Sequence, residues 1–119
     1  MTQHTAPDSH NLFADFPDQN TAEVFADLLR APGVRIERIM STGQSTPAGE
    51  WLVQGWTEWV ALLSGAASLR FDGEADIRAL TPGNWVTIAP DVRHRVEWTA
   101  PNEPTVWLAV HIGEPSSVP

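Results

Sequence analysis

From Val34 to Ile112 the chain repeats one pattern, in which short runs of apolar and β-branched residues alternate with turn residues. Runs of this kind, separated by glycine, proline and aspartate, are typical of short β-strands. Asp72-Gly73 lies between two apolar runs and predicts a hairpin. The pattern predicts eight strands: Val34–Ser41, Trp51–Gln54, Trp59–Ser64, Ala66–Phe71, Ile77–Leu80, Trp85–Ile88, His94–Thr99 and Val106–Ile112.

Ahead of these strands the spacing of apolar residues changes. One stripe at helical spacing is formed by Val24, Phe25, Leu28 and Leu29. Asn20 is a suitable N-cap with Glu23 three residues later, and Pro32-Gly33 is a stop signal. The sequence therefore predicts one short helix over Asn20–Ala31, packed on the outside of a sheet.

Many short strands and a single helix in 119 residues predict one all-β domain, a jelly-roll barrel of two antiparallel sheets. We expect residues 1–10 to form a flexible N-terminal arm. Residues 11–112 are expected to form the barrel domain, and residues 113–119 a flexible tail.

The composition narrows the choice of partners. The net charge is −8, and the seven basic residues are all arginine, so nucleic acid and anionic membrane surfaces are excluded as expected partners. Because there is no cysteine, disulfides, thiol catalysis and zinc–thiolate sites are excluded. No signal peptide and no apolar run of membrane-spanning length is visible, so a cytoplasmic protein is expected.

The candidate chemistry lies in Glu58 and His94, on separate predicted strands. Glu58 precedes Gly65 by a short apolar run, and His94 follows the Pro90-Asp91 turn. A carboxylate and an imidazole placed in this way build an interior polar site in a small barrel. Taken singly, each has an ordinary structural explanation: an arginine partner for Glu58, or a backbone hydrogen bond for His94.

The spacing around Glu58 resembles the first motif of the small single-domain cupins. That motif has a His-x-His pair, then a glutamate, then a glycine after six residues. Glu58 and Gly65 fill the last two positions. Counting back, the two histidine positions fall on Leu52 and Gln54.

The segment from Gly83 to Trp98 resembles the second cupin motif, Gly-x5-Pro-x-Gly-x2-His-x3-Asn. Gly83 and His94 match. Three positions depart from the motif, those occupied by Ala89, Asp91 and Trp98. The resemblance covers about Val34 to Ile112 and implies a double-stranded β-helix.

The family resemblance also implies a divalent metal held by three histidines and a glutamate. Here Glu58 and His94 are two candidate ligands. Gln54 is either a weak carbonyl ligand or a partner that orients Glu58. His111 is a replacement ligand if its strand face looks into the barrel, and otherwise caps a strand end near solvent. The candidate ions are Mn²⁺, Fe²⁺, Ni²⁺ and Zn²⁺.

Four residues are expected around this site: Trp51, Leu52, Trp98, and Arg38 as a binder of a substrate carboxylate. The resemblance therefore implies a metal-dependent cupin that acts on a small organic metabolite, with the reaction unassigned. The alternative is a metal-free, non-catalytic cupin that binds a small ligand. Because the chain is rich in tryptophan and β-branched residues, we also expect a homodimer.

Overall fold

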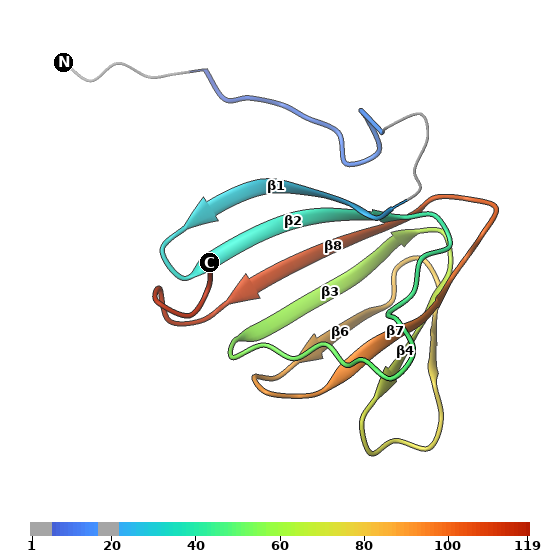
Figure 1. The fold of residues 1–119 in the computed structure, drawn as a ribbon. Coiled ribbons are helices and arrows are strands. Elements are labelled where there is room, and N and C mark those ends of the chain that lie inside the picture. Colours follow the sequence, from blue (N-terminus) through green and yellow to red (C-terminus); the bar gives the residue numbers. More distant parts are fainter. Residues whose placement is uncertain (1–5, 17–21) are drawn as a thin grey trace.

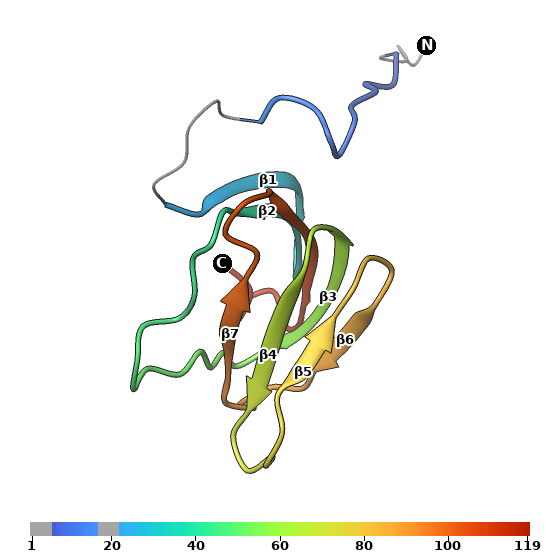
Figure 2. The same cartoon turned by 90° about the vertical axis from the view of Figure 1, so that its right-hand side faces the viewer.

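The computed structural model describes residues 6–16 and 22–119, which form two facing antiparallel sheets (Figure 1). The five-stranded sheet has the order β1-β2-β8-β3-β6, and the three-stranded sheet has the order β5-β4-β7. The strands are β1 (Val24–Ala31), β2 (Val34–Ser41), β3 (Thr57–Ser64), β4 (Ala67–Phe71), β5 (Arg78–Leu80), β6 (Trp85–Ile88), β7 (His94–Thr99) and β8 (Thr105–Ile112). Figure 2 shows the smaller sheet in front of the larger one.

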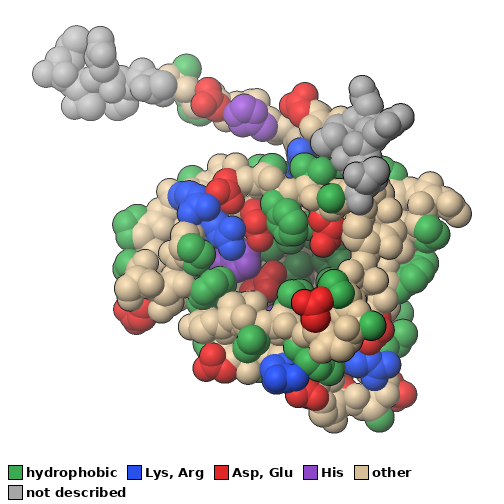
Figure 3. Space-filling view, in the orientation of Figure 1, with side chains coloured by type: hydrophobic (Ala, Val, Ile, Leu, Met, Phe, Trp, Pro, Cys, Tyr) green, Lys and Arg blue, Asp and Glu red, His purple; other side chains and the backbone are tan. Residues whose placement is uncertain are grey.

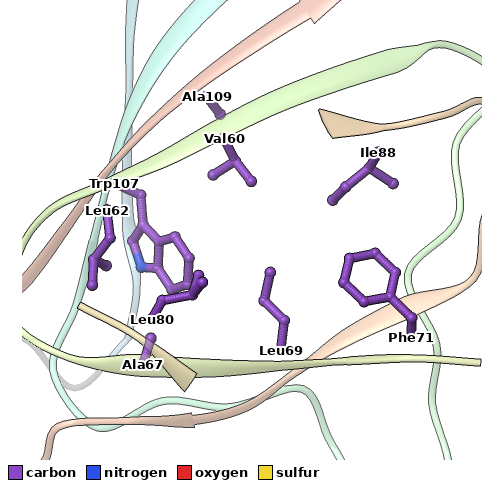
Figure 4. Close-up of a cluster of buried hydrophobic side chains, with 9 residues drawn as sticks. All are labelled: Val60, Leu62, Ala67, Leu69, Phe71, Leu80, Ile88, Trp107 and Ala109. Carbon is purple, nitrogen blue, oxygen red and sulfur yellow. The ribbon is translucent and has the colours of Figure 1, made fainter. Parts of the chain in front are cut away.

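The hydrophobic core lies between the two sheets. On the larger sheet, the register pairs Val60 with Ala109 and Leu62 with Trp107, so these side chains share the inner face. They meet Leu69 and its neighbours from the smaller sheet (Figure 4). Burial of a large apolar side chain contributes roughly 1.5–3 kcal/mol, so this layer joins the two sheets.

The helix predicted over Asn20–Ala31 is wrong. Asn20 lies outside the described residues, and the segment from Val24 onward is β1, paired antiparallel with β2. Gly33, with φ of 76°, makes the tight turn between them. The register shifts between Asp27 and Leu29, so β1 does not alternate regularly there. A strand with such a shift can hold apolar residues whose spacing in the sequence looks helical. The rest of the described chain contains no helix either.

The strand predictions from Val34 onward are confirmed with one exception. Three are confirmed residue for residue: Val34–Ser41, Trp85–Ile88 and His94–Thr99. The strand predicted at Trp51–Gln54 is wrong, because only Leu52 pairs there, through an isolated bridge to His94. A single bridge leaves the flanking residues free to follow the surface as a loop, which fits the exposure of Val53.

Both ends of the described chain contact the larger sheet. The Arg38 guanidinium donates to the carbonyl oxygens of Leu12 (3.2 Å) and Ala14 (2.6 Å), which holds the N-terminal segment over β2. At the other end, the Gly113 N–H donates to the Gly33 carbonyl, and Val118 is buried. Across residues 6–16 and 22–119, no helix has the length and apolar character needed to cross a membrane.

Candidate functional site

A cavity of about 60 Å³ lies between the two sheets, large enough for a few water-sized groups. The hollow opens on the face shown in Figure 3, where acidic and hydrophobic side chains gather around it. Its wall is mostly apolar, and its polar residues are Glu23, Glu58 and His94. The apolar lining residues are Ile39, Val60, Leu69, Ile88, Val96 and Trp107.

His94 presents a lone pair toward Glu58. The ring is 3% exposed, and its Nδ1 lies 2.9 Å from the Val92 carbonyl oxygen. Because a carbonyl oxygen only accepts hydrogen bonds, Nδ1 carries the proton and Nε2 is left as an acceptor. Nε2 lies 3.9 Å from Glu58 Oε1. This separation is too long for a direct hydrogen bond, so Nε2 remains available to a third group, and Oε1, which accepts from Gln54, keeps a second lone pair for it.

Gln54 orients the Glu58 carboxylate. Its side-chain amide donates to Glu58 Oε1 at 3.1 Å, from the loop that precedes β3. Of the two roles predicted for Gln54, the contact present is the one that positions Glu58. Because the Gln54 amide donates this hydrogen bond, Glu58 acts as an acceptor in it.

Glu23 is a further acceptor on the cavity wall. The Trp107 indole N–H donates to Ser41 Oγ at 3.2 Å, and the Ser41 hydroxyl donates to Glu23 Oε2 at 2.7 Å. This chain of donors ends at the Glu23 carboxylate, which can only accept when ionised. Among the described residues that line the cavity there is no arginine, and the N–H groups of Trp107 and His94 are already engaged with Ser41 and the Val92 carbonyl, so the acceptors of Glu23, Glu58 and His94 Nε2 remain.

His111 lies on the inner face of β8, as the alternation with Trp107 predicts, but both of its ring nitrogens are engaged. The Trp56 indole N–H donates to Nδ1 at 2.8 Å, and Nε2 lies 2.8 Å from Glu37 Oε1. Because Nδ1 accepts, the proton resides on Nε2 and is donated to Glu37. His111 is therefore a buried link between a tryptophan and a carboxylate.

The fold was compared with solved structures. A crystal structure from Ralstonia eutropha JMP134, described as a candidate mannose-6-phosphate isomerase, is 45% identical, with a TM-score of 0.86. The match covers 89% of this chain and 98% of that one. Other matching structures, given below, are described as cupins. The chain belongs to the cupin superfamily. No family model matches this cupin. No curated protein matches it either.

More distant cupins share the fold alone. A cupin superfamily protein from Desulfitobacterium hafniense has a TM-score of 0.67 at 14% identity, covering 82% of this chain and 83% of that one. An RmlC-like cupin with a double-stranded β-helix fold from Methanocaldococcus jannaschii has a TM-score of 0.67 at 16% identity, covering 86% and 90%. The double-stranded β-helix implied by the two sequence motifs is therefore supported.

The donor set of this cupin does not fit a resident divalent ion. Glu58 and His94 are two donors, whereas the side chain at the first histidine position, Leu52, has none. His111 is already engaged with Glu37 and Trp56. In the part of the chain that the structure describes, no three His, Asp or Glu side chains are placed to hold one ion. Protein metal sites usually need three or four such ligands.

The four residues expected around the site lie elsewhere than on the cavity wall. Arg38 holds the N-terminal segment, Trp51 lies beneath the Arg93 guanidinium at 5.5 Å, and Trp98 is largely exposed. Leu52 helps to position His94 through its backbone, because the two residues exchange backbone hydrogen bonds of 2.7 and 3.0 Å.

Seven of the nine residues that line the cavity were not expected as site residues, among them Trp107 and Glu23. The alternation of β8 was a sufficient signal for Trp107, which follows the same inner face as Ala109. Glu23 was hidden by the incorrect helix assignment.

Proposed function

We propose that this cupin binds a small, largely apolar compound that carries a hydroxyl or amino group. The observation that carries the proposal is the convergence of acceptors, Glu58, His94 Nε2 and Glu23, on a cavity to whose wall the described residues contribute no arginine. An amino group between Glu58 and His94 can donate to both Oε1 and Nε2, which lie 3.9 Å apart, whereas a hydroxyl group donates its single hydrogen to one of them. The apolar remainder of the compound packs on Val60 and Leu69.

The same chemistry disfavours anionic ligands. A carboxylate or phosphate in this cavity faces the Glu58 carboxylate without a compensating arginine, and like charges at short range are costly in an apolar site. A phosphosugar is also too polar for a space lined mostly by apolar side chains. We therefore do not extend to this chain the activity given for the Ralstonia structure, and we prefer an alcohol or amine to an organic acid.

The reaction class that suits the site is proton transfer. His94 Nε2 has the free lone pair of a general base, and its Nδ1 proton is held by the Val92 carbonyl. On accepting a proton, the imidazolium has the Glu58 carboxylate 3.9 Å away as its counter-ion. The Gln54 amide keeps this carboxylate in place through its hydrogen bond to Oε1.

Thermal denaturation with matched small compounds tests the proposal. Isobutanol and isobutylamine should raise the melting temperature, because a ligand bound only by the folded state stabilises it by mass action. Isobutyrate, which has a similar carbon skeleton but a carboxylate, should have no effect, and neither should mannose 6-phosphate. A rise with isobutyrate but not with isobutanol contradicts the proposal.

Two variants localise the effect. Glu58→Gln and His94→Phe should each abolish the response to isobutanol. Glu97→Gln is the matched control, because Glu97 is a β7 carboxylate paired with Arg70 and Arg95 and does not line the cavity. The protein should also be titrated with Mn²⁺, Fe²⁺, Ni²⁺ and Zn²⁺. A stoichiometric ion that is lost in Glu58→Gln would favour the metal-dependent cupin instead.

A further inference from the structure

Leu52 lies beside His94 and is directed toward the space between the sheets. The two residues form an isolated antiparallel bridge, with backbone hydrogen bonds in both directions. Residues directly opposite in an antiparallel pair point to the same face, and the His94 side chain lines the cavity. Gln54, two residues after Leu52, points the same way, because its amide contacts Glu58. Leu52 therefore shares the inward direction of His94.

A row of three inward-directed side chains crosses the smaller sheet at this level. The register pairs Phe71 on β4 with His94 on β7, and the bridge adds Leu52 beyond β7. Phe71 is 7% exposed and His94 is 3% exposed, whereas Leu52 is 43% exposed. The row therefore begins in the core and reaches solvent at Leu52.

The larger sheet presents a matching row, in which Glu58 on β3 pairs with Ile88 on β6. Ile88 faces Phe71 in the core (Figure 4). Glu58 faces His94, with Oε1 and Nε2 3.9 Å apart. Leu52 is therefore the next position after the Glu58–His94 pair in the direction of solvent, where it forms an apolar rim.

The Glu58–His94 pair thus has apolar surface on two sides. Val60 and Leu69 lie on the cavity wall between the sheets, and Leu52 lies at the rim. A compound whose polar group ends its carbon chain can use only one of these surfaces. A compound whose hydroxyl or amino group is borne by a carbon with two branches can use both.

We propose that Leu52 is a specificity-determining residue and that the preferred compound is a secondary alcohol or a branched amine. One branch lies in the cavity on Val60 and Leu69, and the other lies on Leu52. This inference rests on the proposed function, because Glu58 and His94 hold the polar group. It adds the position of that group within the carbon skeleton.

Two isomeric alcohols test the inference. 2-Methyl-3-hexanol is isobutanol with a propyl group on the carbon that bears the hydroxyl, and 5-methyl-1-hexanol is its primary isomer. Dissociation constants are measured by ¹H–¹⁵N chemical-shift titration. 2-Methyl-3-hexanol should bind about tenfold more tightly than isobutanol, because the propyl group is partly buried on Leu52. 5-Methyl-1-hexanol should bind more weakly than its secondary isomer.

Leu52→Ala and its neighbour Val53→Ala form a matched pair of variants. Val53 is 55% exposed, and strand alternation directs its side chain away from the cavity. Leu52→Ala should weaken the binding of 2-methyl-3-hexanol about fivefold, because the propyl group loses most of its apolar contact. The binding of isobutanol, which has no second branch, should stay within twofold. Val53→Ala should change neither dissociation constant.

The titrations distinguish two failures. If isobutanol binds but the two isomers bind equally, or if Leu52→Ala and Val53→Ala have equal effects, the role of Leu52 is overturned and the proposed function stands. If neither isobutanol nor the larger alcohols bind, the proposed function fails, and the inference about Leu52 fails with it.

Discussion

Replacing His111 by alanine should be among the most destabilising changes in this protein. His111 and Glu37 are each 5% exposed, and Nε2 donates to the carboxylate at 2.8 Å. The variant leaves Glu37 buried beside Arg35, whose guanidinium is 3.4 Å away, as its remaining charged neighbour. It also removes the acceptor of the Trp56 indole N–H.

The magnitude follows from these contacts. A hydrogen bond from a neutral imidazole to a buried carboxylate contributes about 1.5–3 kcal/mol, and the lost Trp56 hydrogen bond and the lost packing of the buried ring each add about 1 kcal/mol. Arg35 compensates in part, so the expected loss is about 4 kcal/mol of unfolding free energy. This is a large share of the roughly 5–15 kcal/mol typical of a domain. At about 4 °C per kcal/mol, the melting temperature should fall by about 15 °C.

Urea denaturation followed by tryptophan fluorescence measures this loss. Glu37→Gln is the informative companion variant, because it keeps an oxygen that accepts from His111 Nε2 and should cost only about 1 kcal/mol. Glu74→Ala, at the exposed Glu74–Arg78 pair, is the control and should leave the denaturation midpoint nearly unchanged. If His111→Ala loses less than about 1 kcal/mol, His111 is not the structural link described above.

Two further predictions follow from the local geometry. Gly65→Ala should destabilise the fold by several kcal/mol in the same urea assay, because Gly65 has φ of 88° and an added Cβ would lie 2.6 Å from Thr105 Cα; a loss below about 1 kcal/mol would contradict this. Gln54→His adds an imidazole beside Glu58 and His94 and should create Ni²⁺ binding that is measurable by calorimetry. The control Gln44→His, in the loop after β2, should not bind Ni²⁺. Equal heats from both variants would show that Glu58 and His94 do not contribute to binding.

The strands from Val34 onward could be predicted because local pattern and tertiary environment agree there. Alternating residues such as Trp107, Ala109 and His111 face the core, and glycine marks the turns. β1 could not be predicted, because its apolar residues have a helix-like spacing in the sequence. A strand can hold that spacing here only because its register shifts near Leu28. The pairing of β1 with β2 is a tertiary contact, and it outweighs a weak local preference for helix.

The candidate site was predictable in part. Motif spacing singled out Glu58 and His94, which lie on β3 and at the start of β7, in the two facing sheets, with Oε1 and Nε2 3.9 Å apart. Sequence spacing cannot show which hydrogen bonds occupy a side chain. His111 is the clearest case, because its availability as a ligand depends on Trp56, 55 residues earlier, and on Glu37, 74 residues earlier.

Long-range ¹H–¹⁵N spectra of the histidine rings in mildly alkaline buffer test most directly whether the cavity presents hydrogen-bond acceptors. We expect opposite tautomers, with the proton on Nδ1 in His94 and on Nε2 in His111. Isobutanol should shift the Nε2 resonance of His94 and leave both His111 resonances in place. A proton on Nε2 of His94, or a His94 ring that does not respond to isobutanol, would show that His94 is not an acceptor in the cavity.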